Sequence, residues 1–115
     1  TIGTLIKNNI QEPLWLFDMT IIHKSIYEKI NFLDENIGWY GKGADLSIAV
    51  GFLTDEIPIP CYNVRVHHDL ENENRGSNID NKLMVDPNQD DFEYIRKKWN
   101  KWIIDNNKNY LYNWV

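Results

Sequence analysis

A carboxylate follows two glycines at the expected start of a helix, in the run Gly41-Lys42-Gly43-Ala44-Asp45. Because glycine carries no Cβ atom, such a run lets the backbone approach another group closely. A carboxylate beside that approach can accept a proton from a hydroxyl group, which is general-base chemistry. The alternative is structural, since an acidic residue also caps a helix or favours its first turn. Asp45 is therefore a candidate base with a structural alternative.

A pair of histidines, His67 and His68, precedes Asp69 at the end of an apolar run. Imidazole can bind a divalent metal or hydrogen-bond a phosphate, and nearby carboxylates can add ligands. Neighbouring residues of a strand point to opposite faces, so the two rings cannot easily share one ion. We therefore expect at most one of them to be a ligand, and the alternative is that neither is.

A turn-like run, Phe32-Leu33-Asp34-Glu35, is followed closely by Trp39-Tyr40. An exposed aromatic ring beside carboxylates suits a sugar, because the ring stacks on C–H groups while carboxylates accept hydrogen bonds from hydroxyls. The alternative is a turn with a hydrophobic anchor. The residues alone leave both interpretations open.

Composition limits the classes of function. The chain has 115 residues and a net charge of −5, which argues against general nucleic-acid binding. Cys61 is the single cysteine, so no internal disulfide can form, and we expect it to pack rather than react. No apolar run reaches the roughly 18 residues of a membrane span. These features give a cytoplasmic location as the expectation.

The elements that must position these groups are predicted from periodicity and punctuation. Residues 14–22 indicate a buried strand, and Ser25 is expected to cap a short helix to Ile30 with Glu28 in a capping box. A helix is predicted over 44–52, with one apolar face made of Leu46, Ala49, Val50 and Leu53.

The second half of the chain is predicted as an extended segment, a loop and a helix. Residues 57–66 favour an edge or irregular strand, because Pro58 and Pro60 lack backbone donors. Residues 70–89 are acidic and polar and indicate a long loop. A helix is predicted from Asp90 or Asp91 to about Asn106, with an apolar stripe and a solvated basic face. Residues 1–12 show no clear period. The resulting fold class is α/β, with too few strands to close a sheet alone.

The order of these features resembles the acceptor-side half of GT-A glycosyltransferases, especially family 2, over residues 14–69. Members commonly show a strand, a short helix, a "GFDE" turn, a glycine-aromatic loop, an acidic step into a "DL" helix, and a strand that ends in His. The matching runs are Phe17-Asp18-Met19-Thr20-Ile21-Ile22, His23-Lys24-Ser25-Ile26-Tyr27-Glu28-Lys29-Ile30, Asp34-Glu35, Trp39-Tyr40-Gly41, Asp45-Leu46-Ser47 and Val64-Arg65-Val66-His67.

The resemblance implies a fold and a reaction. The fold is the C-terminal part of a Rossmann-like GT-A domain, a mixed sheet with flanking helices. In that interpretation residues 1–115 are one domain or a fragment, with a core motif region at 14–69, an acidic loop over the donor at 70–89 and a C-terminal helix at 90–106. The reaction moves a sugar from a nucleotide-diphosphate donor to the hydroxyl of a glycan or another acceptor, with inversion.

The resemblance also implies roles for residues. Asp45 would be the base; Asp34, Glu35, Trp39 and Tyr40 would bind the acceptor. His67, with His68 as the fallback, would bind Mn²⁺ or Mg²⁺ together with a DxD motif that this chain lacks. We expect that motif outside these residues, in a nucleotide-binding half, so that the chain alone turns over nothing.

The sequence departs from the family pattern at one step. Lys42-Gly43 stand where many members carry Glu-Asp, which leaves Asp45 as the single carboxylate. Either Asp45 is the base, as in "GxGxD" forms, or the base has been lost. The second possibility gives a non-catalytic carbohydrate-binding or interaction module. A further alternative to the resemblance as a whole is an unrelated small α/β domain.

Overall fold

Three short strands and three helices make up the described part of the chain. The computed structural model describes residues 2–15, 20–38, 41–67 and 89–113. The elements in chain order are β1 (Ile2–Lys7), β2 (Ile10–Trp15), α1 (Lys24–Lys29), α2 (Lys42–Leu53), α4 (Asp91–Asp105) and β3 (Tyr110–Asn113).

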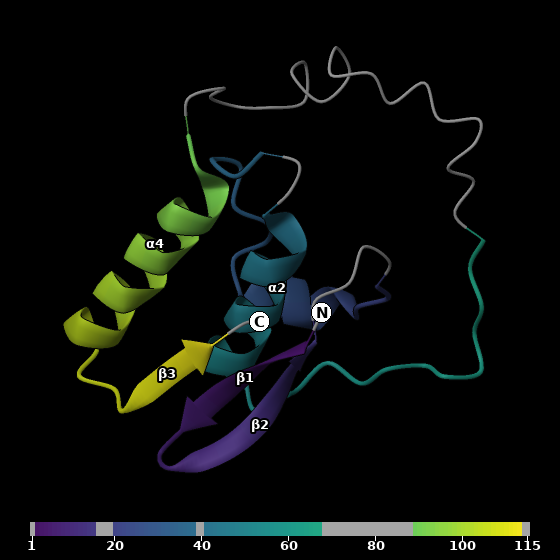
Figure 1. Cartoon of the computed structure of the whole chain (residues 1–115), viewed down its shortest axis with the longest axis horizontal. Coiled ribbons are helices and arrows are strands. Elements are labelled where there is room, and N and C mark those ends of the chain that lie inside the picture. The colour runs from purple at the N-terminus through teal and green to yellow at the C-terminus, as the bar shows by residue number, and fades with distance from the viewer. Residues whose placement is uncertain (1, 16–19, 39–40, 68–88, 114–115) are drawn as a thin grey trace.

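The strands form one antiparallel sheet in the order β2-β1-β3 (Figure 1). A two-residue turn joins β1 to β2, since Lys7 pairs with Ile10 across Asn8 and Asn9. Both turn residues have positive φ, 52° and 69°. Type I′ hairpin turns require such angles, and Asn tolerates them better than most residues. The pairing of Leu5 with Tyr112 then places β3 on the other edge of β1.

The expected strands differ from those observed. No strand was predicted in residues 1–12, but the described part of this range contains most of a hairpin. The prediction missed the hairpin because it did not identify Asn8-Asn9 as a turn. The strand expected over 14–22 ends at Trp15; residues 20–22 form no strand, and 16–19 lie outside the described residues. The mixed sheet was wrong: every observed pairing is antiparallel, and the described residues contain no Rossmann-type parallel sheet.

The expected strand over 57–66 is also absent. This segment is irregular, with a turn closed by the backbone N–H of Val64 and the Cys61 carbonyl, and it pairs with no strand among the described residues. Pro58 and Pro60 remove two donors from one edge of it, which is consistent with its lack of pairing.

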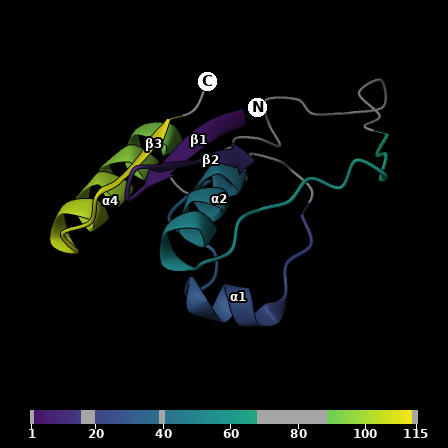
Figure 2. The same ribbon diagram turned by 90° about the horizontal axis from the view of Figure 1, so that it is seen from below.

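The helix α2 lies at the centre of the molecule, under the sheet and between α4 and α1 (Figures 1 and 2). Its residues 44, 45 and 47–52 are buried, so it has no single apolar face, whereas Leu46 and Leu53 are only half-buried. The one-sided face predicted for it was therefore wrong. A helix that is covered on several sides buries more than one stripe of its surface.

Caps fix the ends of the other two helices. The Asp90 carboxylate accepts hydrogen bonds from the backbone N–H groups of Phe92 and Glu93, as the predicted start of α4 required. The predicted cap of α1 was wrong, because the His23 ring accepts from the Ser25 backbone instead. Ser25 therefore lies inside the helix.

The core joins the sheet to α2 and α4. Leu5 and Leu14 of the sheet are fully buried, as are Ile48 of α2 and Ile95 of α4. The aromatic residues extend this core, since the Phe52 ring packs 5.6 Å from the Trp99 ring centre. Further ring pairs connect Phe52 to Trp102, Tyr110 and Tyr112. The core therefore fixes where α2 and α4 face each other.

Candidate functional site

A groove runs between the turn after α1 and the facing sides of α2 and α4. We call it the polar groove, and its volume is about 800 Å³. It is lined by residues 30–36, by Asp45, Ala49 and Leu53 of α2, and by Lys98, Trp99, Lys101, Trp102 and Asp105 of α4.

Local sequence explains how α2 reaches this groove. Asp45, Ala49 and Leu53 recur every four residues, so they share one side of the helix. Gly41 precedes the helix where a Cβ atom would lie 2.8 Å from Ile95 Cδ1 and 2.9 Å from Ile37 Cγ2. The close approach expected of this glycine is therefore confirmed, and it brings the start of α2 against α4.

Asp45 is 4% exposed and is held by two side chains of α4. Lys98 Nζ donates to both carboxylate oxygens, at 2.8 Å to Oδ1 and 2.9 Å to Oδ2. Trp99 Nε1 donates to Oδ1 at 2.7 Å. Asp45 makes no capping hydrogen bond in α2, so its structural role is to join two helices. A carboxylate has about four acceptor positions, so one on Oδ2 is left over among the described residues.

Asp34 is held just as fully. Its Oδ1 accepts from the backbone N–H of Asn36 at 2.9 Å and from that residue's side-chain amide at 3.1 Å. Its Oδ2 accepts from Tyr94 Oη at 3.0 Å and lies 2.9 Å from Lys98 Nζ. These four contacts fill the acceptor positions of the carboxylate. Asp34 therefore anchors the turn to α4.

Lys98 lies between the two carboxylates and contacts both. Burial alone would lower the pKa of its ammonium group, but the hydrogen bonds and charges of Asp45 and Asp34 raise this pKa. Burial likewise acts to raise the pKa of Asp34, and the hydrogen bonds from Lys98, Asn36 and Tyr94 lower it. The three contacts of Lys98 use all three of its N–H donors. We call Asp34, Asp45, Tyr94, Lys98 and Trp99 the carboxylate cluster.

The other predicted acceptor residues have different outcomes. Glu35 lines the polar groove and is exposed, and it makes no hydrogen bond or ion pair with the described residues. Trp39 and Tyr40 lie outside the described residues, so their predicted role stays a prediction. The structure thus brings Asp34, Glu35 and Asp45 to one groove.

The predicted metal ligands lie elsewhere or outside the description. His67 is exposed, directly after the irregular segment 57–66, and lines neither groove. His68 and the acidic loop over 70–89, except Gln89, fall outside the described residues. Within the described ranges, no three His, Cys, Asp or Glu side chains are grouped so that they could hold a metal ion. The DxD ligands were expected outside this chain, so the metal prediction stays open.

The sequence analysis missed the part of the site that α4 supplies. Tyr94 and Lys98 stand four residues apart, beside the stripe that contains Ile95 and Trp99. A lysine next to a buried stripe lies at the edge of the packed face, where it can reach a buried acid. That position on the helix was the available signal.

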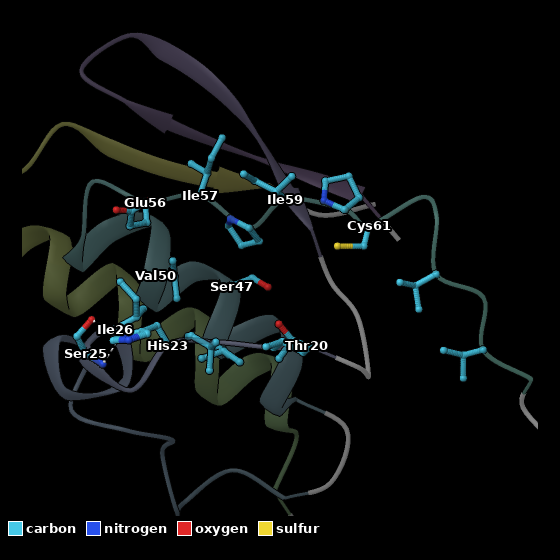
Figure 3. A pocket seen from close by; sticks show the side chains of 17 residues that line it. Thr20, His23, Ser25, Ile26, Ser47, Val50, Glu56, Ile57, Ile59 and Cys61 are labelled. Atoms are coloured by element: carbon cyan, nitrogen blue, oxygen red, sulfur yellow. Dashed lines mark hydrogen bonds between the residues drawn. The ribbon is translucent and has the colours of Figure 1, made fainter.

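A second groove of about 800 Å³ lies on the other side of α2, and we call it the apolar groove. It is lined by residues 20–23, Ser25 and Ile26, by Leu46, Ser47 and Val50 of α2, and by residues 56–61, Val64 and Val66. Figure 3 shows the side chains of Ile57 and Ile59 on one side of it and those of His23 and Ile26 on the other. Ile21 is 103% exposed and Ile59 is 78% exposed, so the wall that these apolar side chains form is uncovered.

Two general findings complete the site. No helix in the described ranges is both long and apolar enough to cross a bilayer. No protein-family model, curated protein or solved structure matches the chain.

Proposed function

We propose that this chain is the acceptor-side part of a GT-A glycosyltransferase, which moves a sugar from a nucleotide-diphosphate donor to a hydroxyl group. One observation carries the proposal: Asp34 of the "FLDE" turn and Asp45 of the helix start contact the same Lys98 ammonium in one groove. The resemblance assigns these two motifs to a single site. The resemblance rests on the order of the motifs and does not include a contact between them. The contact of both carboxylates with Lys98 therefore supports that assignment.

The acceptor position on Asp45 that no described residue fills suits the role of a base. An acceptor hydroxyl that enters the groove would donate its hydrogen bond to Oδ2. As the hydroxyl oxygen bonds to the anomeric carbon, its proton passes to Asp45. The bond from that carbon to the diphosphate breaks, and its electron pair leaves with the diphosphate. Lys98 and Trp99 hold the carboxylate in place during this step.

Donor binding would depend on polypeptide outside these residues. A divalent ion, Mn²⁺ or Mg²⁺, would offset the charge of the departing diphosphate, with DxD ligands from the nucleotide-binding half and His67 or His68 from this chain. The uncovered wall of the apolar groove supports such a larger assembly, because isolated domains rarely leave that many apolar side chains in water.

The test is sugar transfer and donor hydrolysis, with and without Mn²⁺. The 115-residue chain should turn over nothing, whereas the complete gene product should be active. In that product, Asp45→Asn should lower kcat by about 10² to 10⁴, the usual contribution of a general base. Asp105→Asn is the matched control, since it is a carboxylate of the same groove that is exposed and pairs with Lys101.

Two results would contradict the proposal. Robust turnover by the 115-residue chain would refute the missing half. Full activity of Asp45→Asn, with Asp105→Asn also active, would remove Asp45 as the base.

One observation favours the alternative, a non-catalytic carbohydrate-binding module. Three of the four acceptor positions of Asp45 are taken, and the side chain is only 6% exposed, which limits access to the base. A module would bind a glycan equally well with Asp45→Asn and would show no transfer in any form of the protein. Glycan binding without turnover in the complete product therefore selects this alternative.

A further inference from the structure

One aromatic residue of the polar groove has a backbone conformation that its side chain does not favour. Phe32 has φ of 63°, and Asn31 before it has φ of 61°. A positive φ is uncommon outside glycine and Asn, and for a bulky residue it costs about 1–3 kcal/mol. Burial of the ring does not offset this cost, because Phe32 is 56% exposed. The residue is therefore strained and presented to solvent at once.

The position of Phe32 is fixed by its neighbours. Its backbone N–H donates to the Tyr27 carbonyl at 2.8 Å, which closes the end of α1. Its ring stacks on the Tyr27 ring with an interplanar angle of 12° and a centre distance of 6.4 Å. One ring face is thus supported, and the residue lines the polar groove.

The carboxylates of the polar groove outnumber its ammonium groups. Lys98 is shared by Asp34 and Asp45, which leaves one negative charge over, and Lys101 is paired with Asp105. Glu35 remains, exposed and without an ionic partner among the described residues. A ligand in this groove therefore meets the Phe32 ring and the Glu35 carboxylate, which stands three positions later in the sequence. An anionic ligand would find no free lysine there and would be repelled by Glu35.

We propose that Phe32 and Glu35 form the acceptor subsite of the groove, and that it takes a hexopyranose without a negative charge. The Phe32 ring stacks on the C–H face of the sugar, and the Glu35 carboxylate accepts hydrogen bonds from its hydroxyls. The strained backbone of Phe32 holds the ring at the groove before the sugar arrives, which reduces the entropy lost on binding. This inference rests on the proposed function, because it names the substrate class of that site.

The test is an NMR titration of the ¹⁵N-labelled chain with methyl glucoside, galactoside and mannoside, and with methyl glucuronoside as the charged partner of the glucoside. At least one neutral glycoside should shift the amide signals of residues 31–36. Phe32→Ala should weaken its binding about tenfold, and Phe32→Trp should retain it. Tyr62→Ala is the matched control, since that aromatic residue is 79% exposed and lines neither groove.

The charged partner tests the second residue. The glucuronoside should bind at least about fivefold more weakly than the glucoside, and Glu35→Gln should reduce this difference. Phe32→Gly guards against misfolding, because glycine adopts the same φ without strain and should also lose binding.

The outcomes separate the two proposals. Binding that is unchanged in both Phe32→Ala and Phe32→Gly, or a failure of all three neutral glycosides to bind, overturns this inference. Equal binding of the glucuronoside overturns the assignment to a sugar without a negative charge. The proposed transferase activity is judged separately, by the effect of Asp45→Asn on turnover in the complete product.

Discussion

Lys98 is the residue on which the carboxylate cluster depends. Its Nζ lies within 2.9 Å of both Asp34 and Asp45, and its side chain is 29% exposed. Removal of the ammonium would leave two partly buried carboxylates without their cation. Such a loss is costly because a buried charge without a partner keeps its full desolvation penalty.

We therefore expect Lys98→Met to lower the free energy of unfolding by about 2–4 kcal/mol. Lys97→Met is the control, since Lys97 is 77% exposed and pairs with Glu93 at the surface; its effect should stay within about 0.5 kcal/mol. Urea denaturation at neutral pH measures both. Equal effects of the two variants would show that the cluster contributes little to stability.

Asp34 makes stability depend on pH in the acid range. Its pKa is lowered from the usual 3.8, so near that pH the unfolded chain binds more protons than the folded one. Stability therefore rises with pH there: the contribution is complete above the unfolded value and is lost as the pH falls through the folded value. Asp34→Asn should unfold more easily at pH 6 and lose part of this acid dependence.

The measurement is the urea midpoint between about pH 2.5 and 6. Asp55→Asn, at an exposed position, should keep the wild-type slope. An unchanged slope in Asp34→Asn would contradict the role of this carboxylate.

Phe32 shows what a sequence pattern can hide. Its backbone has a φ of 63°, in the left-handed region that glycine adopts without strain. The residue types predicted the turn and its carboxylates. They did not predict the strained backbone of Phe32, which is identified by its φ.

At the scale of the elements, α2 packs on the sheet through a glycine. A Cβ atom on Gly51 would collide with the side chain of Leu5, which is completely buried on β1. The helix therefore approaches the strand more closely than an alanine would allow.

Gly51→Ala should destabilise the protein by about 1–3 kcal/mol, although alanine favours a helix by about 1 kcal/mol over glycine. We expect the overpacking term to exceed the propensity term because Leu5 is completely buried, so its side chain can shift only within the core. Asn100→Ala, at an exposed position of α4, changes propensity alone and should be neutral or slightly stabilising. Thermal unfolding of both variants is the measurement, and a more stable Gly51→Ala would refute the close contact.

The elements differ in how far sequence predicted them. The start of α4 was predicted correctly because Asp90 caps it and the apolar residues repeat at helical spacing. The strand β3, only four residues long, carries no comparable local signal and depends on pairing with β1. The contact of Lys98 with Asp45 could not be predicted, since it joins residues 53 positions apart and depends on how two helices pack.

At the scale of the whole molecule, the apolar groove is lined by exposed hydrophobic side chains. Ile21 and Ile59 line it and are almost fully in water, so their removal costs the folded chain little packing. A surface of this kind commonly marks a place where further protein packs.

The double variant Ile21→Asp, Ile59→Asp should bind less of a dye such as ANS and self-associate less, with its Tm within a few degrees of the wild type. Ile104→Asp is the control, because Ile104 is 76% exposed on α4 and lines neither groove. Dye fluorescence and sedimentation measure the two effects. If Ile104→Asp reduced dye binding and self-association equally, the groove would not be a distinct hydrophobic binding surface.

The strand order of the sheet also determines in which order the strands can pair during synthesis. β1 pairs with β2 across a two-residue turn, whereas its pairing with β3 encloses nearly the whole chain. A hairpin forms within about 1–10 μs, so β1 and β2 can pair while the ribosome is still working. The other edge of β1 then stays open until Tyr110–Asn113 leaves the exit tunnel, since a distant partner must close a long loop. Because β3 directly follows α4, the helix that brings Lys98 to the groove also docks late. A nascent chain that still lacks α4 therefore cannot assemble the carboxylate cluster, because this helix supplies Tyr94, Lys98 and Trp99.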